Sequence, residues 1–447
     1  RLGLRPQATL PAPDGDEGRR YRQPWRDAVL VQVDMIIGTS ADQIAITPGV
    51  LRREWMENGR RYFHYATERP ESFGATVISG RYAVVEDRWN DVALSIFHHP
   101  RHAYNLESFT GAMKAALQYF SAQFGPYPYD EMRIAEVPRY DSYGRAHPFT
   151  IEFTENFFLT RPQDGQFDQV FFGTAHEIAH TWWGGQVRSA SDVRGGQGFV
   201  SETLANYSAM MVTEKTFGME AARKVYDYQM NRYLMRRSDL ARDVPLLESQ
   251  DQAYISYGKG AVAMYTLREH VGEERVHAAL RRFLEKHRAG VPPYPTSYDL
   301  FAELRASTPD SFHPLLTDLF ETVTLWDVRA DRARVEPTGT GEYRVTIDVV
   351  ARKVRADSVG NETEVPMDDL VELGIFAPGD GAGLGAPLYL QRHRIRSGEQ
   401  TIRITVPRSA HAEGSTAVSP QLREGGEPAR AGIDPWGKLI DRQRDDN

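Results

Sequence analysis

The sequence predicts an α+β protein of several domains, with β-rich segments near both ends and a helical region between them. Three observations support this prediction. The chain has 447 residues, which is too long for one ordinary hydrophobic core. Apolar residues alternate with polar ones near the two ends, and they recur at helical spacing in the middle. We therefore predict three domains, residues 1–104, 105–325 and 326–447.

The first predicted domain contains strands between about residues 28 and 99. Its short apolar or alternating runs are AVLVQVDMIIG, RYAVVEDRW and VALSIFHH. Asn58 and Gly59 form a dipeptide that is typical of a two-residue hairpin turn. Because the chain begins with Arg rather than Met, we expect this domain to be truncated and the chain to be a fragment of a longer protein.

The second predicted domain is mostly helical. Apolar residues lie three and four apart in LESFTGAMKAALQYFSAQFG, and Gly125 and Pro126 end that helix. Similar patterns continue to about Thr324. The helical region is therefore the largest part of the chain.

The third predicted domain returns to a period of two after Trp326. The predicted strands are YRVTIDVV, LVELGIFA, LYLQRHRI and TIRITV, with turns at residues 378–386 and at Ser397-Gly398. Residues 408–447 are rich in Gly, Pro and charge and are predicted to form an extended or docked tail.

Composition excludes several classes of protein. Hydrophobic residues make up 41% and charged residues 26% of the chain, which is typical of globular domains. A net charge of −8 without a dense basic segment argues against a nucleic-acid partner. The sequence has no apolar stretch long enough to span a membrane, so we expect the chain as given to be soluble. Without cysteine, a metal ion must be bound by histidine and carboxylate groups.

The strongest functional pattern runs from Asp168, a candidate N-cap, to a glycine stop at Gly184-Gly185. His176 and His180 are four residues apart, so on a helix they share one face and can bind the same metal ion. Glu177 projects beside them and would act as a general base toward water activated by zinc. The competing interpretation is two surface histidines that share this spacing by chance.

Catalytic zinc usually takes three protein ligands and leaves one position to water. We predict Glu202 as the third ligand, near the start of the next helix, with Ser201 as its N-cap. The alternative is that Glu202 only complements the helix dipole.

These residues resemble the zinc aminopeptidases of the aminopeptidase N and leukotriene hydrolase family. The segment from Ser201 to Tyr207, Ser-Glu-Thr-Leu-Ala-Asn-Tyr, is similar to that family's Asn-Glu-Gly-Phe-Ala-x-Tyr motif. The interval before Glu202 is longer than in the family, and we place the additional residues in the loop around residues 194–198. The resemblance implies a thermolysin-like, mostly helical catalytic domain that binds one zinc ion through His176, His180 and Glu202.

Two further segments resemble motifs of this family. Glu152-Phe-Thr-Glu155-Asn156 is similar to the exopeptidase motif Gly-x-Met-Glu-Asn, which implies that Glu155 binds the α-amine of the substrate. Glu152 and Thr154 depart from the motif, and the alternative for Glu155 is an ordinary glutamate on an edge strand. Tyr-Gly-Lys-Gly-Ala, beginning at Tyr257, resembles the family's Tyr-x-Lys-Gly-Ala. It implies that Tyr257 stabilises the oxyanion, an interaction worth about 3 to 4 kcal/mol at other oxyanion donors.

Neighbouring residues offer weaker alternatives. Tyr254 is a second candidate for the oxyanion donor, and Asn206 is a candidate group for steadying Glu202. His98-His99-Pro-Arg-His102 suggests a second metal site, but we favour a structural role because the segment ends a predicted strand. We assign Trp182-Trp183 to the hydrophobic core.

A narrower likeness concerns bacterial proteins in which an aminopeptidase domain is fused to permease segments of the ABC transporter type. It is carried by His-Thr-Trp-Trp-Gly-Gly-Gln-Val, Ser-Ala-Met-Met and the tail Ala431-Gly-Ile-Asp-Pro435. It implies a parent protein in a bacterial inner membrane, with this domain extracytoplasmic. It also implies a C-terminal β-sandwich-like domain and an open cleft without the family's large helical domain.

The predicted function is a zinc-dependent aminopeptidase that acts on peptides. One alternative is a gluzincin endopeptidase with the same zinc site. The other is a non-catalytic peptide-binding or regulatory domain of a transporter, against which the intact Glu177 and Tyr257 argue.

Overall fold

The computed structural model describes most of the chain, and its contacts group the residues into two compact units. The first unit contains the chain up to Tyr233 together with Leu246–His313, and the second contains Leu234–Pro245 and everything from Pro314. The predicted division into three domains stays a prediction. The described residues are 18–20, 30–72, 77–161, 166–191, 193–196, 198–237, 243–250, 252–288, 290–339, 341–379, 384–408 and 426–444.

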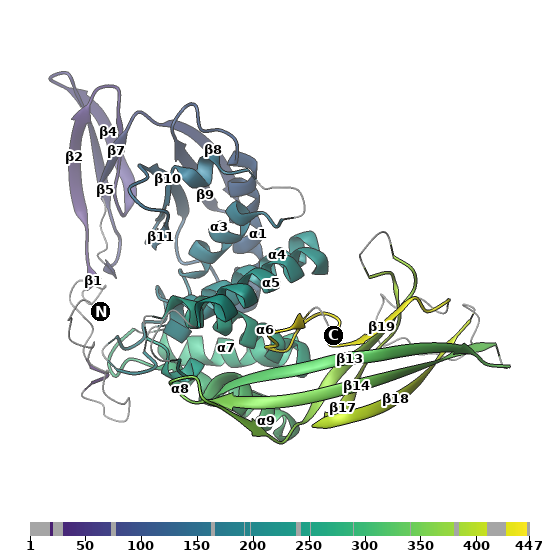
Figure 1. Cartoon of the computed structure of the whole chain (residues 1–447). Coiled ribbons are helices and arrows are strands. Elements are labelled where there is room, and N and C mark those ends of the chain that lie inside the picture. The colour runs from purple at the N-terminus through teal and green to yellow at the C-terminus, as the bar shows by residue number, and fades with distance from the viewer. Residues whose placement is uncertain are drawn as a thin grey trace, which may run out of the picture. The chain divides into compact units, whose positions relative to one another are not determined.

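The first unit opens with short antiparallel strands (Figure 1). Strands β4 and β5 form the predicted hairpin, and both Asn58 and Gly59 have positive φ, 48° and 74°, as a tight hairpin turn requires. Strand β5 also pairs with β2, and β3 pairs with β7. The strands are β1 (Leu30–Val31), β2 (Asp34–Ser40), β3 (Ile44–Ile46), β4 (Val50–Glu57), β5 (Arg60–Ala66), β6 (Glu71–Ser72) and β7 (Ile78–Gly80).

A five-stranded mixed sheet follows, in the order β11-β12-β10-β9-β8. Strand β10 runs parallel to both β9 and β12, whereas β8 and β11 are antiparallel edge strands. Helix α1 connects β9 to β10, as a parallel crossover requires. The sheet therefore joins strands from both sides of the predicted boundary at residue 104. Its elements are β8 (Ala83–Trp89), β9 (Val92–His98), α1 (Leu106–Phe124), β10 (Glu131–Val137), β11 (Gly144–His147) and β12 (Thr150–Thr154).

The middle of the chain is mostly helical, which confirms the secondary structure predicted for it. Helix α3 packs against both α1 and α4. Trp182 and Trp183 are fully buried, and their ring N–H groups donate to Gly125 O and Ser208 Oγ, which confirms that both belong to the core. The helices are α2 (Asn156–Leu159), α3 (Gln169–Ala179), η1 (Phe199–Thr203), α4 (Leu204–Phe217), α5 (Met219–Arg236), η2 (Leu246–Glu248), η3 (Tyr254–Lys259), α6 (Gly260–Val271), α7 (Glu273–His287), α8 (Ser297–Ser307), η4 (Asp310–Phe312), α9 (His313–Leu316) and η5 (Thr317–Glu321).

The second unit consists mainly of two antiparallel sheets, β13-β14-β15 with β18 beside β14, and β17-β16-β19. The buried Lys353 forms ion pairs with two aspartates: its Nζ lies 2.8 Å from Asp318 Oδ2 and 3.0 Å from Asp369 Oδ1. The described part of the predicted tail docks on this unit, because Trp326 N donates to Ile440 O; residues 409–425 lie outside the described residues. The strands are β13 (Val323–Pro337), β14 (Glu342–Ala356), β15 (Glu362–Val365), β16 (Asp368–Phe376), β17 (Pro387–Arg396), β18 (Gly398–Pro407) and β19 (Arg430–Ile433).

The fold class predicted from the sequence is confirmed: a β-rich N-terminal part, a helical middle and β-sheets toward the C-terminus. None of the helices in the described parts of the chain is both long and apolar enough to cross a membrane.

Candidate active site

Helix α3 carries the histidine pair, and its start is fixed by the predicted cap. Asp168 Oδ1 accepts hydrogen bonds from the backbone N–H groups of Val170 and Phe171, at 3.0 and 2.9 Å. Such a cap satisfies donors that the first turn leaves free. The helix ends at Ala179, and His180 follows as its C-cap. The two histidines thus lie at the C-terminal end of a buried, capped helix.

His176, His180 and Glu202 bring three potential metal ligands together. The two imidazole Nε2 atoms are 3.2 Å apart, and Glu202 Oε2 lies 3.4 Å from His176 Nε2 and 3.3 Å from His180 Nε2. A tetrahedral zinc ion with bonds of about 2.0 to 2.1 Å holds its ligand atoms about 3.3 to 3.4 Å apart. The spacing of these atoms therefore fits a zinc ion.

The chemistry of this group also fits a cation. Glu202 Oε2 is buried and makes no hydrogen bond of good geometry within the described residues. Burial opposes ionisation of Glu202, but the two imidazoles outweigh it and hold its pKa well below the usual value. Burial alone would lower the pKa of His180, yet Glu202 raises it to about 9. A carboxylate between two imidazoles thus attracts positive charge, which zinc would supply in place of a proton.

The turn after α3 orients His180. Its Nδ1 lies 3.0 Å from the carbonyl oxygen of Trp183, so the ring donates there and leaves Nε2 free to bind metal. Ser201 Oγ lies 3.3 Å from the same Nδ1 and donates to the same carbonyl at 3.4 Å. Ser201 and Trp183 therefore orient His180, a candidate metal ligand, and this role was not predicted from the sequence.

The prediction that Ser201 is an N-cap is wrong. The helix begins one turn earlier, as the π-helical turn η1 after Gly198. Phe199 and Val200 are fully buried, and burying their side chains favours continuing the helix toward the N-terminus. The wide turn of a π-helix occurs often at functional sites, and here it carries Glu202.

Glu177 lies against the edge strand β11. The backbone N–H of Ala146 donates to its carboxylate, and burial raises its pKa above the usual value, which favours acceptance of a proton. A Cβ atom added at Gly144 would lie only 2.7 Å from Glu177 Oε1, so glycine permits this close approach. Gly144 and Ala146 were not predicted as site residues, although a glycine within a strand is a known signal of such an approach.

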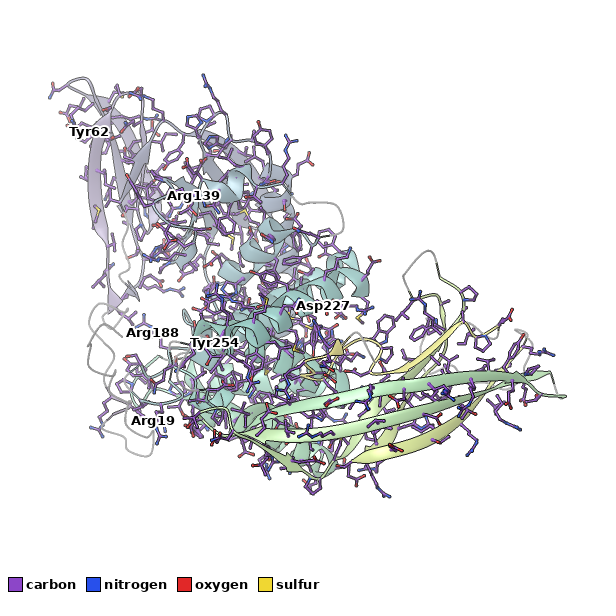
Figure 2. All side chains as sticks on the ribbon, viewed as in Figure 1. Arg19, Tyr62, Arg139, Arg188, Asp227 and Tyr254 are labelled. Carbon is purple, nitrogen blue, oxygen red and sulfur yellow. The ribbon has the colours of Figure 1, made fainter. Side chains whose placement is uncertain are left out.

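Tyr257 completes the group. Its ring stacks on His176, with centroids 5.6 Å apart, and its hydroxyl donates to Glu202. Burial and then Glu202 raise the pKa of Tyr257, so the phenol stays neutral and can donate. Tyr254, labelled in Figure 2, instead stacks its ring on Tyr233 at 6.2 Å.

Two contacts position the segment that carries Tyr257. Asn206 Nδ2 donates to the carbonyl oxygen of Tyr257 at 3.3 Å, so Asn206 steadies this segment. A Cβ atom added at Gly260 would lie 2.1 Å from Thr203 Oγ1. The glycine after Lys259 therefore lets η3 approach the helix that carries Glu202.

The region that contains this group of residues matches the model of a known protein family. Residues 104–307 match the Peptidase family M1 domain. The matched segment includes all five residues of the group just described, namely His176, Glu177, His180, Glu202 and Tyr257.

Similar proteins support the same fold. The chain is 23% identical over 228 residues to Tricorn protease-interacting factor F2 from Thermoplasma acidophilum, a match that covers 47% of this chain and 28% of that protein. The chain thus spans less than a third of that relative. Aminopeptidase A from Legionella pneumophila, solved with aspartic acid, has a TM-score of 0.55 at 14% identity, over 93% of this chain and 44% of that one. An M1 zinc metallopeptidase from Deinococcus radiodurans has a TM-score of 0.50 at 17% identity, over 65% of this chain and 63% of that one.

Glu155 belongs to a second group of side chains, within the segment that matches the family model. Its backbone N–H donates to Val137 O at 3.0 Å, and its carboxylate lies within 4.8 Å of ligating atoms of His102 and Glu136. Among the described residues, no hydrogen bond or ion pair joins Glu155 to the candidate metal ligands His176, His180 and Glu202. The structure therefore brings five of the six predicted site residues together, and the role of Glu155 stays a prediction.

Within the second group, Glu136 has two hydrogen-bond partners. Glu136 accepts hydrogen bonds from the backbone N–H of His99, at 2.6 Å, and from the ring of His102, at 2.5 Å. The rings of His99 and His102 are 4.5 Å apart. His102, Glu136 and Glu155 could also hold a metal ion, so the structural role of the His98–His102 segment stays a prediction.

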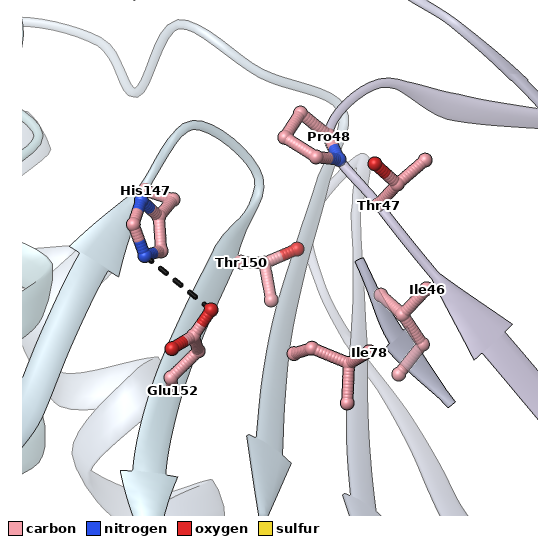
Figure 3. Close-up of a pocket in the computed structure, with 7 residues that line it drawn as sticks. All are labelled: Ile46, Thr47, Pro48, Ile78, His147, Thr150 and Glu152. Carbon is pink, nitrogen blue, oxygen red and sulfur yellow. Dashed lines mark ion pairs between the residues drawn. The ribbon is translucent and has the colours of Figure 1, made fainter. Parts of the chain in front are cut away.

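Glu152, which departs from the exopeptidase motif, lines a small pocket. Figure 3 shows Glu152, Thr150 and His147 beside residues of the N-terminal strands, among them Ile46 and Ile78. Glu152 Oε1 lies 3.4 Å from His147 Nε2. The glutamate that replaces glycine is therefore accommodated by a histidine on the neighbouring strand β11.

Proposed function

We propose that this chain is a zinc-dependent aminopeptidase, which hydrolyses peptides at their N-terminal residue. The observation that carries the proposal is the spacing of His176, His180 and Glu202, whose ligating atoms lie 3.2 to 3.4 Å apart beside the buried Glu177. The match of residues 104–307 to the Peptidase family M1 domain supports the same chemistry.

The residues of the group divide the work of hydrolysis. One zinc ion held by His176, His180 and Glu202 would supply a Lewis acid that also makes water acidic enough to react near neutral pH. Glu177 takes a proton from the attacking water and passes it to the leaving amine. Tyr257 donates a hydrogen bond to the oxyanion that forms at the scissile carbonyl.

The exopeptidase part of the proposal assigns the substrate's α-amine to Glu155. An ammonium group next to a carboxylate is favourable, and Glu136 adds a second negative charge nearby. The competing candidate is a gluzincin endopeptidase. It is favoured by the position of Glu155, whose carboxylate lies within 4.8 Å of ligating atoms of His102 and Glu136 and not in the group of His176, His180 and Glu202. A non-catalytic role is disfavoured by Glu177 and Tyr257.

For the parent protein, we propose permease segments of the ABC transporter type and an extracytoplasmic position for this domain in a bacterial inner membrane. This part rests on the likeness of sequence motifs alone.

The test combines zinc analysis with turnover. The purified chain is expected to contain one zinc ion and to release chromophore from a panel of amino-acid anilides, whereas Glu177→Gln should keep zinc and lose turnover. Peptides with a blocked N-terminus should not be cleaved. Absence of zinc would contradict the metal site, and cleavage of blocked peptides that survives Glu155→Gln would favour the endopeptidase.

A further inference from the structure

Arg232 lies next to the proposed catalytic tyrosine. This residue belongs to helix α5, and its guanidinium carbon is 4.5 Å from the ring centroid of Tyr257. The same ring stacks on the proposed zinc ligand His176 at 5.6 Å. One aromatic ring thus contacts both a zinc ligand and a partly buried positive charge.

The guanidinium of Arg232 has no carboxylate partner within the described part of the chain. Other buried or partly buried arginines are paired: Arg268 with Glu214 and Glu269, and Arg237 with Asp243. Arg232 differs from them because its five N–H donors have no protein acceptor among the residues that the structure describes. A guanidinium over an aromatic ring can make this contact through its face and keep the N–H donors at its edge available.

We propose that Arg232 binds a carboxylate of the peptide substrate, on the side of the leaving group. The inference rests on the proposed function. A guanidinium presents donors in a fork that matches a carboxylate with two parallel hydrogen bonds. Arg232 and the His176 ring both contact the ring of Tyr257. These two contacts limit the distance between Arg232 and His176 to the length of about three residues of extended peptide. The carboxylate is thus the free C-terminus of a short peptide or an acidic side chain close to the cut.

A different role for Arg232 would be to hold the ring of Tyr257 in place. The two roles predict different dependence on the substrate. Loss of ring positioning would slow the hydrolysis of every peptide alike, whereas loss of a carboxylate site affects only peptides that carry the carboxylate. The comparison of matched substrates therefore separates them.

The chain offers a matched control. Arg161 lies over the ring of Tyr104 at the same distance, 4.5 Å, but it belongs to the loop after α2 rather than to the zinc-binding group. Arg161→Gln therefore removes an equivalent cation–π contact. The test variants are Arg232→Gln, which removes the charge, and Arg232→Lys, which keeps the charge but loses the fork.

The experiment uses the zinc-loaded full chain and two pairs of peptides. One pair is a tripeptide with a free C-terminus and its C-terminal amide. The other is a longer amidated peptide with Asp or Asn at the second position. We expect the wild type to favour the carboxylate member of at least one pair. Arg232→Gln should reduce that ratio of kcat/KM about tenfold, mainly through KM, and Arg161→Gln should leave it unchanged. The pair that responds identifies the source of the carboxylate.

A binding measurement keeps this inference separate from the proposed function. In a Glu177→Gln background, affinity for each peptide is measured without turnover, with and without Arg232→Gln. Tighter binding of the carboxylate member that Arg232→Gln abolishes supports the proposal, even if the wild type hydrolyses neither pair. Equal binding of the members of both pairs overturns it, as does a ratio of kcat/KM that Arg232→Gln leaves intact.

Discussion

Glu202 and His180, which are separated by a loop in the chain, meet with Oε2 and Nε2 only 3.3 Å apart. The helix end after α3 supplies the imidazole, and the π-helical turn η1 supplies the carboxylate. Because the same carboxylate oxygen also lies 3.4 Å from His176, neither helix alone forms the site. We therefore expect metal binding to depend on how α3 packs against α4, the helix that continues from η1.

Replacing the carboxylate tests the zinc ligand directly. Glu202→Gln keeps the shape of the side chain but removes its negative charge, so zinc affinity should fall at least about a hundredfold, the upper end for groups that merely support a ligand. Zinc competition with a chelator measures the change. Glu220→Gln, on an exposed residue of α5, is the control. Equal zinc affinity in Glu202→Gln and the wild type would contradict the assignment.

Tyr257→Phe tests the oxyanion donor. The variant loses only the hydroxyl, and a hydrogen bond made mainly in the transition state contributes to kcat rather than to KM. We expect kcat to fall about a hundredfold to a thousandfold while zinc content stays the same. Tyr254→Phe is the control, because that ring stacks on Tyr233. A large loss of kcat in Tyr254→Phe instead would move the role to Tyr254.

Features of the site that depend on neighbouring residues in the sequence could be predicted, whereas features that depend on long-range packing could not. The cap at Asp168 and the four-residue spacing of His176 and His180 are local, so the sequence sufficed for both. The start of the next helix was misplaced because burial of Phe199 decides it, and burial depends on distant residues. Arg232 was not singled out, because no pattern in α5 shows that it lies over Tyr257.

The same distinction between local and long-range interactions explains which features of the five-stranded sheet could be predicted. Local alternation predicted strands within residues 28–99, and β8 and β9 are among them. Their pairing with β10, beyond helix α1, is long-range and leaves no local signal. The predicted boundary at residue 104 therefore falls between strands of one sheet.

His277 is expected to make stability depend on pH. It is fully buried between Tyr207 and Gln123, and burial lowers its pKa to about 4, against about 6.5 in the unfolded chain. Below pH 6.5 the unfolded chain binds a proton that the folded chain refuses. The contribution of neutral His277 to the free energy of unfolding is thus fully present above pH 6.5. It is lost as the pH falls toward 4, and the total loss is about 3 kcal/mol.

Denaturant unfolding at pH 7.5 and pH 5 measures this dependence. His277→Gln removes the titrating group, so its free energy of unfolding should change less between the two pH values than that of the wild type. An unchanged dependence in His277→Gln would show that other groups cause it.

Gly144→Ala is expected to impair catalysis while zinc remains bound. The added methyl group would lie 2.7 Å from both Glu177 Oε1 and the ring of Phe153, so the carboxylate of the general base must move. A displacement of about 1 Å at a catalytic group can cost on the order of a hundredfold in rate. Gly111→Ala, in α1, meets no atom within 4 Å and should stabilise the helix by up to about 1 kcal/mol. Measuring kcat and zinc content for both variants decides the matter: wild-type kcat in Gly144→Ala would mean that Glu177 does not need its close approach to strand β11.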